Sequence, residues 1–216
     1  MCLMAISAQI SPADNNSDTD TSGYVDLGLS VKWATCNLGA TKPEEMGDYY
    51  AWGETSIKLD YGSFFEYKWS YDGTYNTLNK YNTKHSFGVV DKKKVLDAED
   101  DAAHVKLGGK WRIPTRAEWS ELMKKCTWTW TTQGGVNGYK VTSKINGESI
   151  FLPTTLYRDR IRVGPDDHGS YHGYYWSSSL CTVEPDEAWN MYLASIYFHM
   201  SHESRCRGMS VRPVTE

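Results

Sequence analysis

Residues 111–119 have the sequence Trp-Arg-Ile-Pro-Thr-Arg-Ala-Glu-Trp, and this stretch says most about the fold. Thr115 and Glu118 have the spacing of an S/T-x-x-E capping box, in which each side chain satisfies a backbone N–H that the first helical turn leaves unpaired. Four apolar residues then recur on one helical face: Trp119, Leu122, Met123 and Cys126. The pattern predicts a helix that runs to about Lys125 and packs on a sheet.

The segments around this helix predict the rest of the fold. Residues 24–34 alternate apolar and polar side chains, which indicates a hairpin that turns near Gly28. Asp97 is a candidate N-cap for a short helix over residues 98–105 that stops before Gly108. Further strands are predicted with turns between them: 127–132, 139–143, 144–152, 174–179, 188–194 and 210–214. Gly134-Gly135 and Asn137-Gly138 are expected in the first of these turns. Few helices and many strands predict an α+β fold in one domain, residues 24–216.

Residues 1–23 differ in composition from the rest of the chain. Met1–Gln9 is short, apolar and ends in small residues, like the end of a signal peptide's apolar region, although it lacks a basic start. Residues 11–23 contain only Ser, Pro, Ala, Asp, Asn, Thr and Gly, which predicts a flexible linker. We therefore expect a signal-peptide remnant and linker over 1–23, and a protein that is secreted or displayed on a cell or phage surface.

The composition of the chain narrows the class of partner. The 23 Lys and Arg against 27 Asp and Glu give a net charge of −4, whereas nucleic acid and anionic membrane surfaces favour a basic face. No apolar run is long enough for a transmembrane helix. Rings are abundant, with 9 Trp, 15 Tyr and 5 Phe. We expect no nucleic-acid partner, no transmembrane segment, and a protein or glycan ligand whose identity the sequence leaves open.

Rings and histidines concentrate in one C-terminal stretch. Eight rings lie there: Tyr171, Tyr174, Tyr175, Trp176, Trp189, Tyr192, Tyr197 and Phe198. Four histidines accompany them: His168, His172, His199 and His202. Rigid amphipathic rings beside short polar residues are typical of antibody-like binding sites. Because strand side chains alternate between faces, about half of the rings should point inward. We expect Trp176 and Trp189 in the core, and Tyr197, His199 and loops 181–187 and 201–207 on the exposed face.

The segment 111–119 is similar to the R-L-P-T-x-x-E-W motif of formylglycine-generating-enzyme-like domains. The wider pattern resembles the Fibrobacter succinogenes major paralogous domain. The matching pieces span most of the chain: Tyr24–Ala40, Gly47–Glu54, Asp97–Ala103, Trp111–Trp119, Phe151–Asp159, Gly173–Ser179 and Gly208–Val214. The resemblance implies a C-type-lectin-like fold, with small twisted antiparallel sheets flanked by two helices, paired chain ends, and a ligand face made by the last strands and their loops.

The same fold is used by variable proteins of diversity-generating retroelements, in which adenine-directed mutagenesis randomises C-terminal codons. Here Tyr175–Ser179 and Ser210–Val214 resemble scaffold segments that bracket a stretch of mixed character. The resemblance implies a variable ligand-binding face that includes Cys181, Thr182, Val183, Pro185, Asp186, Tyr197, His199, Ser201, His202, Ser204, Arg205 and Arg207. The leading expectation is a non-catalytic, receptor-like or adhesin-like variable protein. An invariant surface or pilus-associated adhesin domain is the alternative.

Other chemistries fit the sequence less well. A formylglycine-generating-enzyme-like oxidoreductase needs closely placed reactive cysteines, and Cys181 and Cys206 are far apart in sequence. Glu184-Pro185-Asp186 is similar to a lectin calcium loop, but few further oxygen ligands accompany it. The spacings of His199 with His202 and of His168 with His172 suit zinc without completing a ligand set. We expect no catalysis, no metal and no cofactor.

Two residue groups stay open to simpler interpretations. One is a set of acidic residues that we interpret as a stabilised helix N-terminus: Asp97, Glu99, Asp100 and Asp101. The other is a set of cysteines: Cys36, Cys126, Cys181 and Cys206. These four allow three disulfide pairings, and free buried thiols are an equal alternative.

Overall fold

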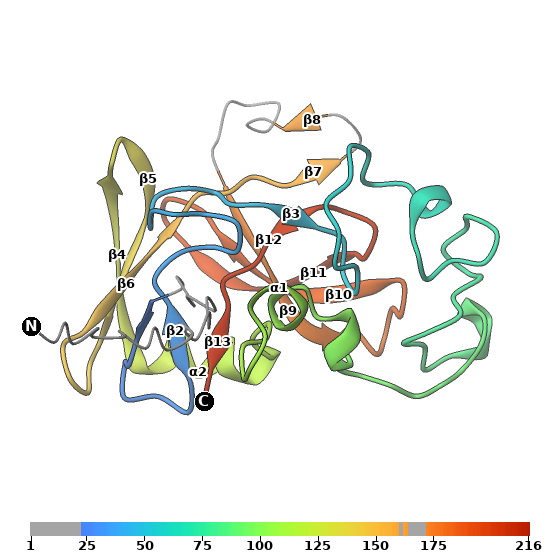
Figure 1. Ribbon diagram of the computed structural model, residues 1–216, viewed down its shortest axis with the longest axis horizontal. Helices are drawn as coiled ribbons and strands as arrows, with labels where there is room; N and C mark the ends of the chain where they lie inside the picture. Colours follow the sequence, from blue (N-terminus) through green and yellow to red (C-terminus); the bar gives the residue numbers. More distant parts are fainter. Residues whose placement is uncertain (1–22, 160–161, 164–171) are drawn as a thin grey trace, which may run out of the picture.

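The computed structural model describes residues 23–159, 162–163 and 172–216. Small, mostly antiparallel sheets dominate it and its helices are short, so the α+β prediction is confirmed at that level (Figure 1). The predicted signal-peptide remnant lies outside the described residues, and so do nearly all of the linker, His168 and Tyr171.

One small sheet joins the two ends of the folded chain. It consists of β1 (Tyr24–Val25), β2 (Lys32–Ala34) and β13 (Val214–Thr215), with β2 in the centre. Trp33 of β2 pairs with β1 on one side and with β13 on the other. Gly28 has a φ of 69° in the turn between β1 and β2, a conformation that glycine adopts without a steric penalty. The predicted hairpin is therefore confirmed.

The longest helix, α2 (Arg116–Lys125), begins as the sequence predicts. The backbone N–H of Glu118 donates to the Thr115 hydroxyl at 3.3 Å, and the N–H of Thr115 donates to the Glu118 carboxylate at 2.7 Å. Arg112 donates two side-chain hydrogen bonds to the same carboxylate, one of them 2.8 Å long. The Arg112 backbone N–H also donates to Val214 O, so this network joins the helix start to β13.

A second sheet consists of β4 (Cys126–Gln133), β5 (Val136–Ser143) and β6 (Ser149–Pro153), all antiparallel. Gly134 and Gly135 make the β4–β5 turn, as predicted. Gly138 lies inside β5 rather than in a turn, so that part of the prediction is wrong. A Cβ on Gly138 would collide with the β6 backbone, so the close approach of two strands explains this glycine.

The largest sheet has five strands in the order β11-β10-β9-β12-β3. Their bounds are Phe198–Ser204 for β11, Glu187–Leu193 for β10, Gly173–Leu180 for β9, Met209–Ser210 for β12 and Tyr49–Tyr50 for β3. All neighbours are antiparallel except β12 and β9, which are parallel. The predicted loop 201–207 is wrong in its first half, because residues 201–204 belong to β11.

The core has a distinct cluster on each side of this sheet. In the first, Trp33 and Trp119 pack edge to face with ring centroids 4.7 Å apart, and the β9 residue Tyr175 joins them. In the second cluster, Trp176 packs with Trp52 and other buried residues. Trp176 is completely buried, as predicted. The abundant aromatic rings therefore pack on both sides of the five-stranded sheet.

The remaining elements are short: η1 (Phe64–Glu66), η2 (His85–Phe87), η3 (Ala98–Asp100), α1 (Ala102–Leu107), β7 (Arg158–Asp159) and β8 (Arg162–Val163). The predicted helix over 98–105 is two pieces. Asp97 precedes only a 3-10 turn and makes no capping bond. The α1 N-cap is Asp101, whose carboxylate accepts from two backbone N–H groups of α1 and from that of Ile113. The helix stops before Gly108, as predicted.

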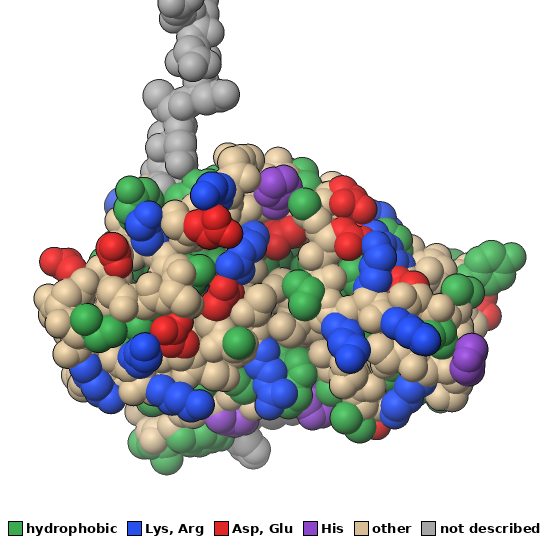
Figure 2. All heavy atoms as spheres, turned by 90° about the horizontal axis from the view of Figure 1, so that it is seen from below, with side chains coloured by type: hydrophobic (Ala, Val, Ile, Leu, Met, Phe, Trp, Pro, Cys, Tyr) green, Lys and Arg blue, Asp and Glu red, His purple; other side chains and the backbone are tan. Residues whose placement is uncertain are grey.

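The surface carries charges of both signs. Lys and Arg side chains are interspersed with Asp and Glu over the face drawn in Figure 2. Within the described residues, no helix has the length and apolar character needed to cross a membrane.

Candidate binding surface

The β10–β11 hairpin presents two different faces because paired residues of antiparallel strands lie on the same side of the sheet. Tyr192 pairs with His199 on one side, and Trp189 pairs with His202 on the other. The spacing of His199 and His202 by three residues therefore separates them, because both lie on one strand. Their spacing in the sequence suits a zinc site, but the structure places the two imidazoles on opposite sides of the sheet.

We call the first of these two sides the aromatic face; its residues are His172, Tyr174, Tyr192, Tyr197 and His199. Tyr192 is at the centre, with ring centroids 5.1 Å from Tyr174 and from His199 and 5.7 Å from Tyr197. The Tyr197 and His199 rings stack with an interplanar angle of 15°. A hydrogen bond of 3.0 Å joins the Tyr192 hydroxyl to His172 Nδ1.

The outer end of the aromatic face is open to solvent. Tyr197 is 50% exposed and its neighbour Ile196 is 87% exposed, at the turn between β10 and β11. A hydrogen bond of 2.8 Å from Ala194 N to Tyr197 O closes this turn. The exposed rings thus stand on a fixed backbone, an arrangement that loses little entropy when a ligand binds.

The opposite face of the hairpin enters the core for most of its length. Phe198 stacks on Trp128 of β4 at 4.4 Å, and Met200 packs beside it. At the far end, the Arg116 guanidinium lies 3.4 Å from the Trp189 ring centroid, and the His202 ring meets the same indole edge on. Trp189 is half-buried, so the prediction of a core position is only partly confirmed.

The 181–186 loop connects β9 with β10. Thr182 and Val183 are exposed, as predicted. Cys181 and Pro185 are buried, so their predicted place on the exposed face is wrong. The exposed part of this loop and the aromatic face lie at opposite ends of the seven-residue strand β10, which separates them by about 20 Å at about 3.3 Å per residue.

Arg205 is the largest correction to the predicted face. Its side chain is completely buried. Its Nε donates to the Tyr67 hydroxyl at 2.8 Å, and its remaining nitrogens donate to the carbonyls of Lys80, Tyr81 and Pro185. A buried cation is tolerated only where its nitrogens have hydrogen-bond acceptors, and these four bonds give every guanidinium nitrogen of Arg205 an acceptor. Arg205 therefore holds together loops from three parts of the chain.

The twelve predicted residues consequently divide into groups. Tyr197, His199 and Ser201 share one side of the hairpin. His202 and Ser204 point to the other side, where His202 Nδ1 contacts the Glu187 carboxylate. Arg207 and Asp186 are half-buried, and Arg207 pairs with Glu203. Tyr197 and His199, with the partly exposed Ser201, form one exposed group, and Thr182 and Val183 form a second one at the other end of β10.

Two residues that sequence reasoning did not select lie beside the aromatic face. Asn190 is completely buried on the same side of the sheet, opposite Ser201, and neither polar atom of its side chain has a hydrogen-bond partner. Glu203 follows on the same side of β11, and burial raises the pKa of its carboxyl. The alternation of residues 198–204 could have revealed the strand, but nothing in the sequence marks Asn190 as unpaired.

The acidic residues around Asp97 form ion pairs with lysines. Asp97, Glu99 and Asp100 are close enough to hold a metal ion, but the Lys80 ammonium lies 2.7 Å from Asp97 and 2.6 Å from Asp100. Lys68 adds a second cation, 3.0 Å from Asp100. Internal ion pairs therefore account for these carboxylates.

The cysteines of the described residues are free thiols. Cys126, Cys181 and Cys206 are buried and Cys36 is partly exposed. Burial raises the pKa of the Cys206 thiol, whereas a reactive cysteine has a lowered one. Of the two interpretations left open by the sequence, free thiols are confirmed for these four.

Comparison of the chain with models of protein families, with curated proteins and with solved structures found no match.

Proposed function

We propose that this protein is a non-catalytic ligand-binding domain with a C-type-lectin-like fold that acts outside the cell or on a phage surface. The observation that carries the proposal is the aromatic face, a contiguous group of tyrosine and histidine rings on the adjacent strands β9, β10 and β11 and the residues next to them. Such rings combine large contact area with polar groups at their tips, and they have few torsions to immobilise.

Three features of the architecture support the lectin-like part of the proposal. The chain ends pair in one small sheet, and α2 covers one side of the largest sheet (Figure 1). The hairpin of the last two long strands also carries the exposed rings of Tyr197 and His199. The binding residues are thus held on a scaffold that other segments stabilise.

We further propose that the exposed positions of the last strands vary between copies of the gene, as in diversity-generating retroelements. Tyr197, His199 and Thr182 can change without loss of core packing, because their side chains are exposed. Arg205 and Cys181 cannot. Sequencing the locus across a natural population should find substitutions at the exposed positions, with Arg205 constant. A uniform sequence would favour the invariant adhesin alternative.

The binding experiment compares variants on a glycan array and on a displayed protein library. The double variant Tyr197→Ala/His199→Ala should lose at least about tenfold in affinity for any ligand that the unmodified chain selects. Tyr71→Ala is the matched control, because Tyr71 is 86% exposed and lies on a different segment. Equal loss in both variants, or in neither, would refute the assignment of the face.

A thiol titration distinguishes the oxidoreductase alternative. That reaction requires a low-pKa, accessible thiol at Cys181 or Cys206, which would react with an alkylating reagent near neutral pH before Cys36 does. We expect Cys36 to react first, because it is the most exposed of the four.

A further inference from the structure

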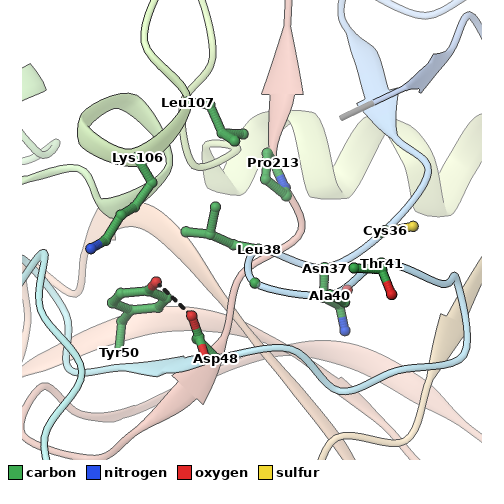
Figure 3. Close-up of a pocket in the computed structure, with 11 residues that line it drawn as sticks. Cys36, Asn37, Leu38, Ala40, Thr41, Asp48, Tyr50, Lys106, Leu107 and Pro213 are labelled. Atoms are coloured by element: carbon green, nitrogen blue, oxygen red, sulfur yellow. Dashed lines mark hydrogen bonds between the residues drawn. The ribbon is translucent and has the colours of Figure 1, made fainter. Parts of the chain in front are cut away.

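A cavity of about 470 Å³ lies between the end of α1 and the loop that follows β2 (Figure 3). Leu38, Leu107 and Pro213 form its apolar wall. No residue of the aromatic face lines it, so it is a separate feature of the molecule. Its volume lies within the range of small-molecule sites in proteins.

Two opposite charges line this cavity. The Lys106 ammonium and the Asp48 carboxylate flank the Tyr50 hydroxyl (Figure 3). Within the described residues, Lys106 has no ion-pair partner, and the Asp48 side chain accepts only the Tyr50 hydroxyl, at 3.3 Å. Unlike the acidic groups around Lys80, these two charges are available to a ligand.

The backbone fixes Asp48 in position. Gly39 has a φ of 82°, and a Cβ at this residue would collide with the Asp48 carboxylate. The Asp48 N–H donates to Leu38 O at 2.8 Å. Burial raises the pKa of Tyr50, so its hydroxyl stays protonated and donates to the Asp48 carboxylate. Asp48 and Tyr50 are therefore held in place before any ligand arrives, which lowers the entropic cost of binding.

We propose that this cavity binds a small zwitterion with an apolar side chain, an amino acid or a dipeptide. Its ammonium group pairs with Asp48 and its carboxylate with Lys106. Its side chain contacts Leu38 and Leu107. Charge complementarity at two separate points gives selectivity for molecules that carry both groups, because a ligand that lacks either one leaves a charge unpaired.

The test uses leucine and leucyl-leucine as probes, with leucinamide and 4-methylpentanoate as analogues that each lack one charge. Binding is measured by calorimetry and by protection of Cys36, which lines the same cavity, from alkylation. We expect saturable binding of leucine or leucyl-leucine. The affinity of both analogues should be lower by at least about tenfold. Absence of binding at about 10 mM, or equal binding of zwitterions and analogues, would overturn the proposal.

Variants locate the site. Lys106→Met should reduce the affinity at least about tenfold, whereas Lys110→Met, at an exposed lysine paired with Glu216, should leave it unchanged. Asp48→Asn should abolish the preference for leucine over 4-methylpentanoate, and its melting temperature shows whether it is folded. Full affinity in both Lys106→Met and Asp48→Asn would refute the site. Replacing Tyr197 should have no effect here, so this proposal and that of the aromatic face fail separately.

Discussion

The β10–β11 hairpin and the segment that follows it, residues 205–212, are adjacent in sequence but differ in how their polar groups are satisfied. On the hairpin, Tyr197 and His199 are exposed and contact mainly each other and Tyr192. In the following segment, Arg205 and Arg212 are completely buried, and each donates four hydrogen bonds.

The hairpin therefore supplies an exposed surface, whereas Arg205 and Arg212, which we call the clamp, hold distant segments of the chain together. Arg212 donates to the carbonyls of Ala34, Thr35 and Phe151 and to the side chain of Asn37. These acceptors are mostly backbone atoms of distant segments, so the arginines hold loops together instead of facing a ligand. Binding and stability should therefore respond to different substitutions.

The largest expected effect tests the clamp. Arg205→Ala should lower the free energy of unfolding by about 3 kcal/mol or more, because it leaves a cavity and unpaired buried carbonyls. Chemical denaturation measures this change. Arg207→Ala is the control, since an ion pair at the half-exposed surface contributes less than about 1 kcal/mol. A small effect at Arg205 would show that its loops are held by other contacts.

The next effect concerns the network that joins α2 to β13. Hydrogen bonds from Arg112 hold the pKa of Glu118 below its ordinary value of 4.5, although burial opposes this. A lowered folded-state pKa gives stability that is present above the unfolded value and lost as the pH falls through the folded one. Glu118→Gln should cost about 1.5 kcal/mol at neutral pH.

The same variant should also be less sensitive to acid. Denaturation curves between neutral pH and pH values below 4.5 should converge for Glu118→Gln and the unmodified chain. A constant difference across this range would exclude the ionised carboxylate as the source of the stability. Hairpin substitutions such as Tyr197→Ala should instead show the same acid sensitivity as the unmodified chain.

Replacing Asn190 should stabilise the protein, whereas the substitutions above should destabilise it. Both of its side-chain polar atoms are buried without partners, whereas every guanidinium nitrogen of Arg205 has at least one hydrogen-bond acceptor. Asn190→Leu should therefore raise the free energy of unfolding by about 1 kcal/mol, because it removes the cost of burying an unpaired amide. A thermal melt measures the change. A loss of stability would indicate that the amide is held by a bridging molecule.

The smallest expected effect on stability belongs to the exposed rings. Tyr197→Ala should change the free energy of unfolding by less than about 0.5 kcal/mol, as is usual for surface positions. Denaturation of this variant beside Arg205→Ala gives the sharpest contrast between hairpin and clamp. Comparable losses in the two variants would contradict the division between them.

The sequence predicted the elements whose signals are local. The capping box of Thr115 and Glu118, the hairpin around Gly28 and the β4–β5 pair all depend on residues within a few positions of one another. Tyr197 and His199 were also expected on the exposed face, and both are exposed. Their role in binding remains a prediction.

The errors have a common physical origin in distant contacts. Arg205 is a typical surface residue by composition, and its burial depends on carbonyls from residues 80, 81 and 185. Asp101 rather than Asp97 is the N-cap of α1, and its carboxylate also accepts from the distant Ile113 N–H. Cys181 and Pro185 are in a loop, but the loop folds against the core. No local pattern encodes such partners.

The pairing of β13 with β2 has a consequence for the order of folding. Val214 pairs with Trp33, one of the first residues of the folded domain, so this contact closes a loop of most of the chain. Contacts between residues so distant in sequence form slowly, because the entropy of loop closure is lost before the contact contributes. The first hairpin can pair with β13 only after all the residues between β2 and β13 have been synthesised. We therefore expect a folding reaction that is slow for a domain of this size.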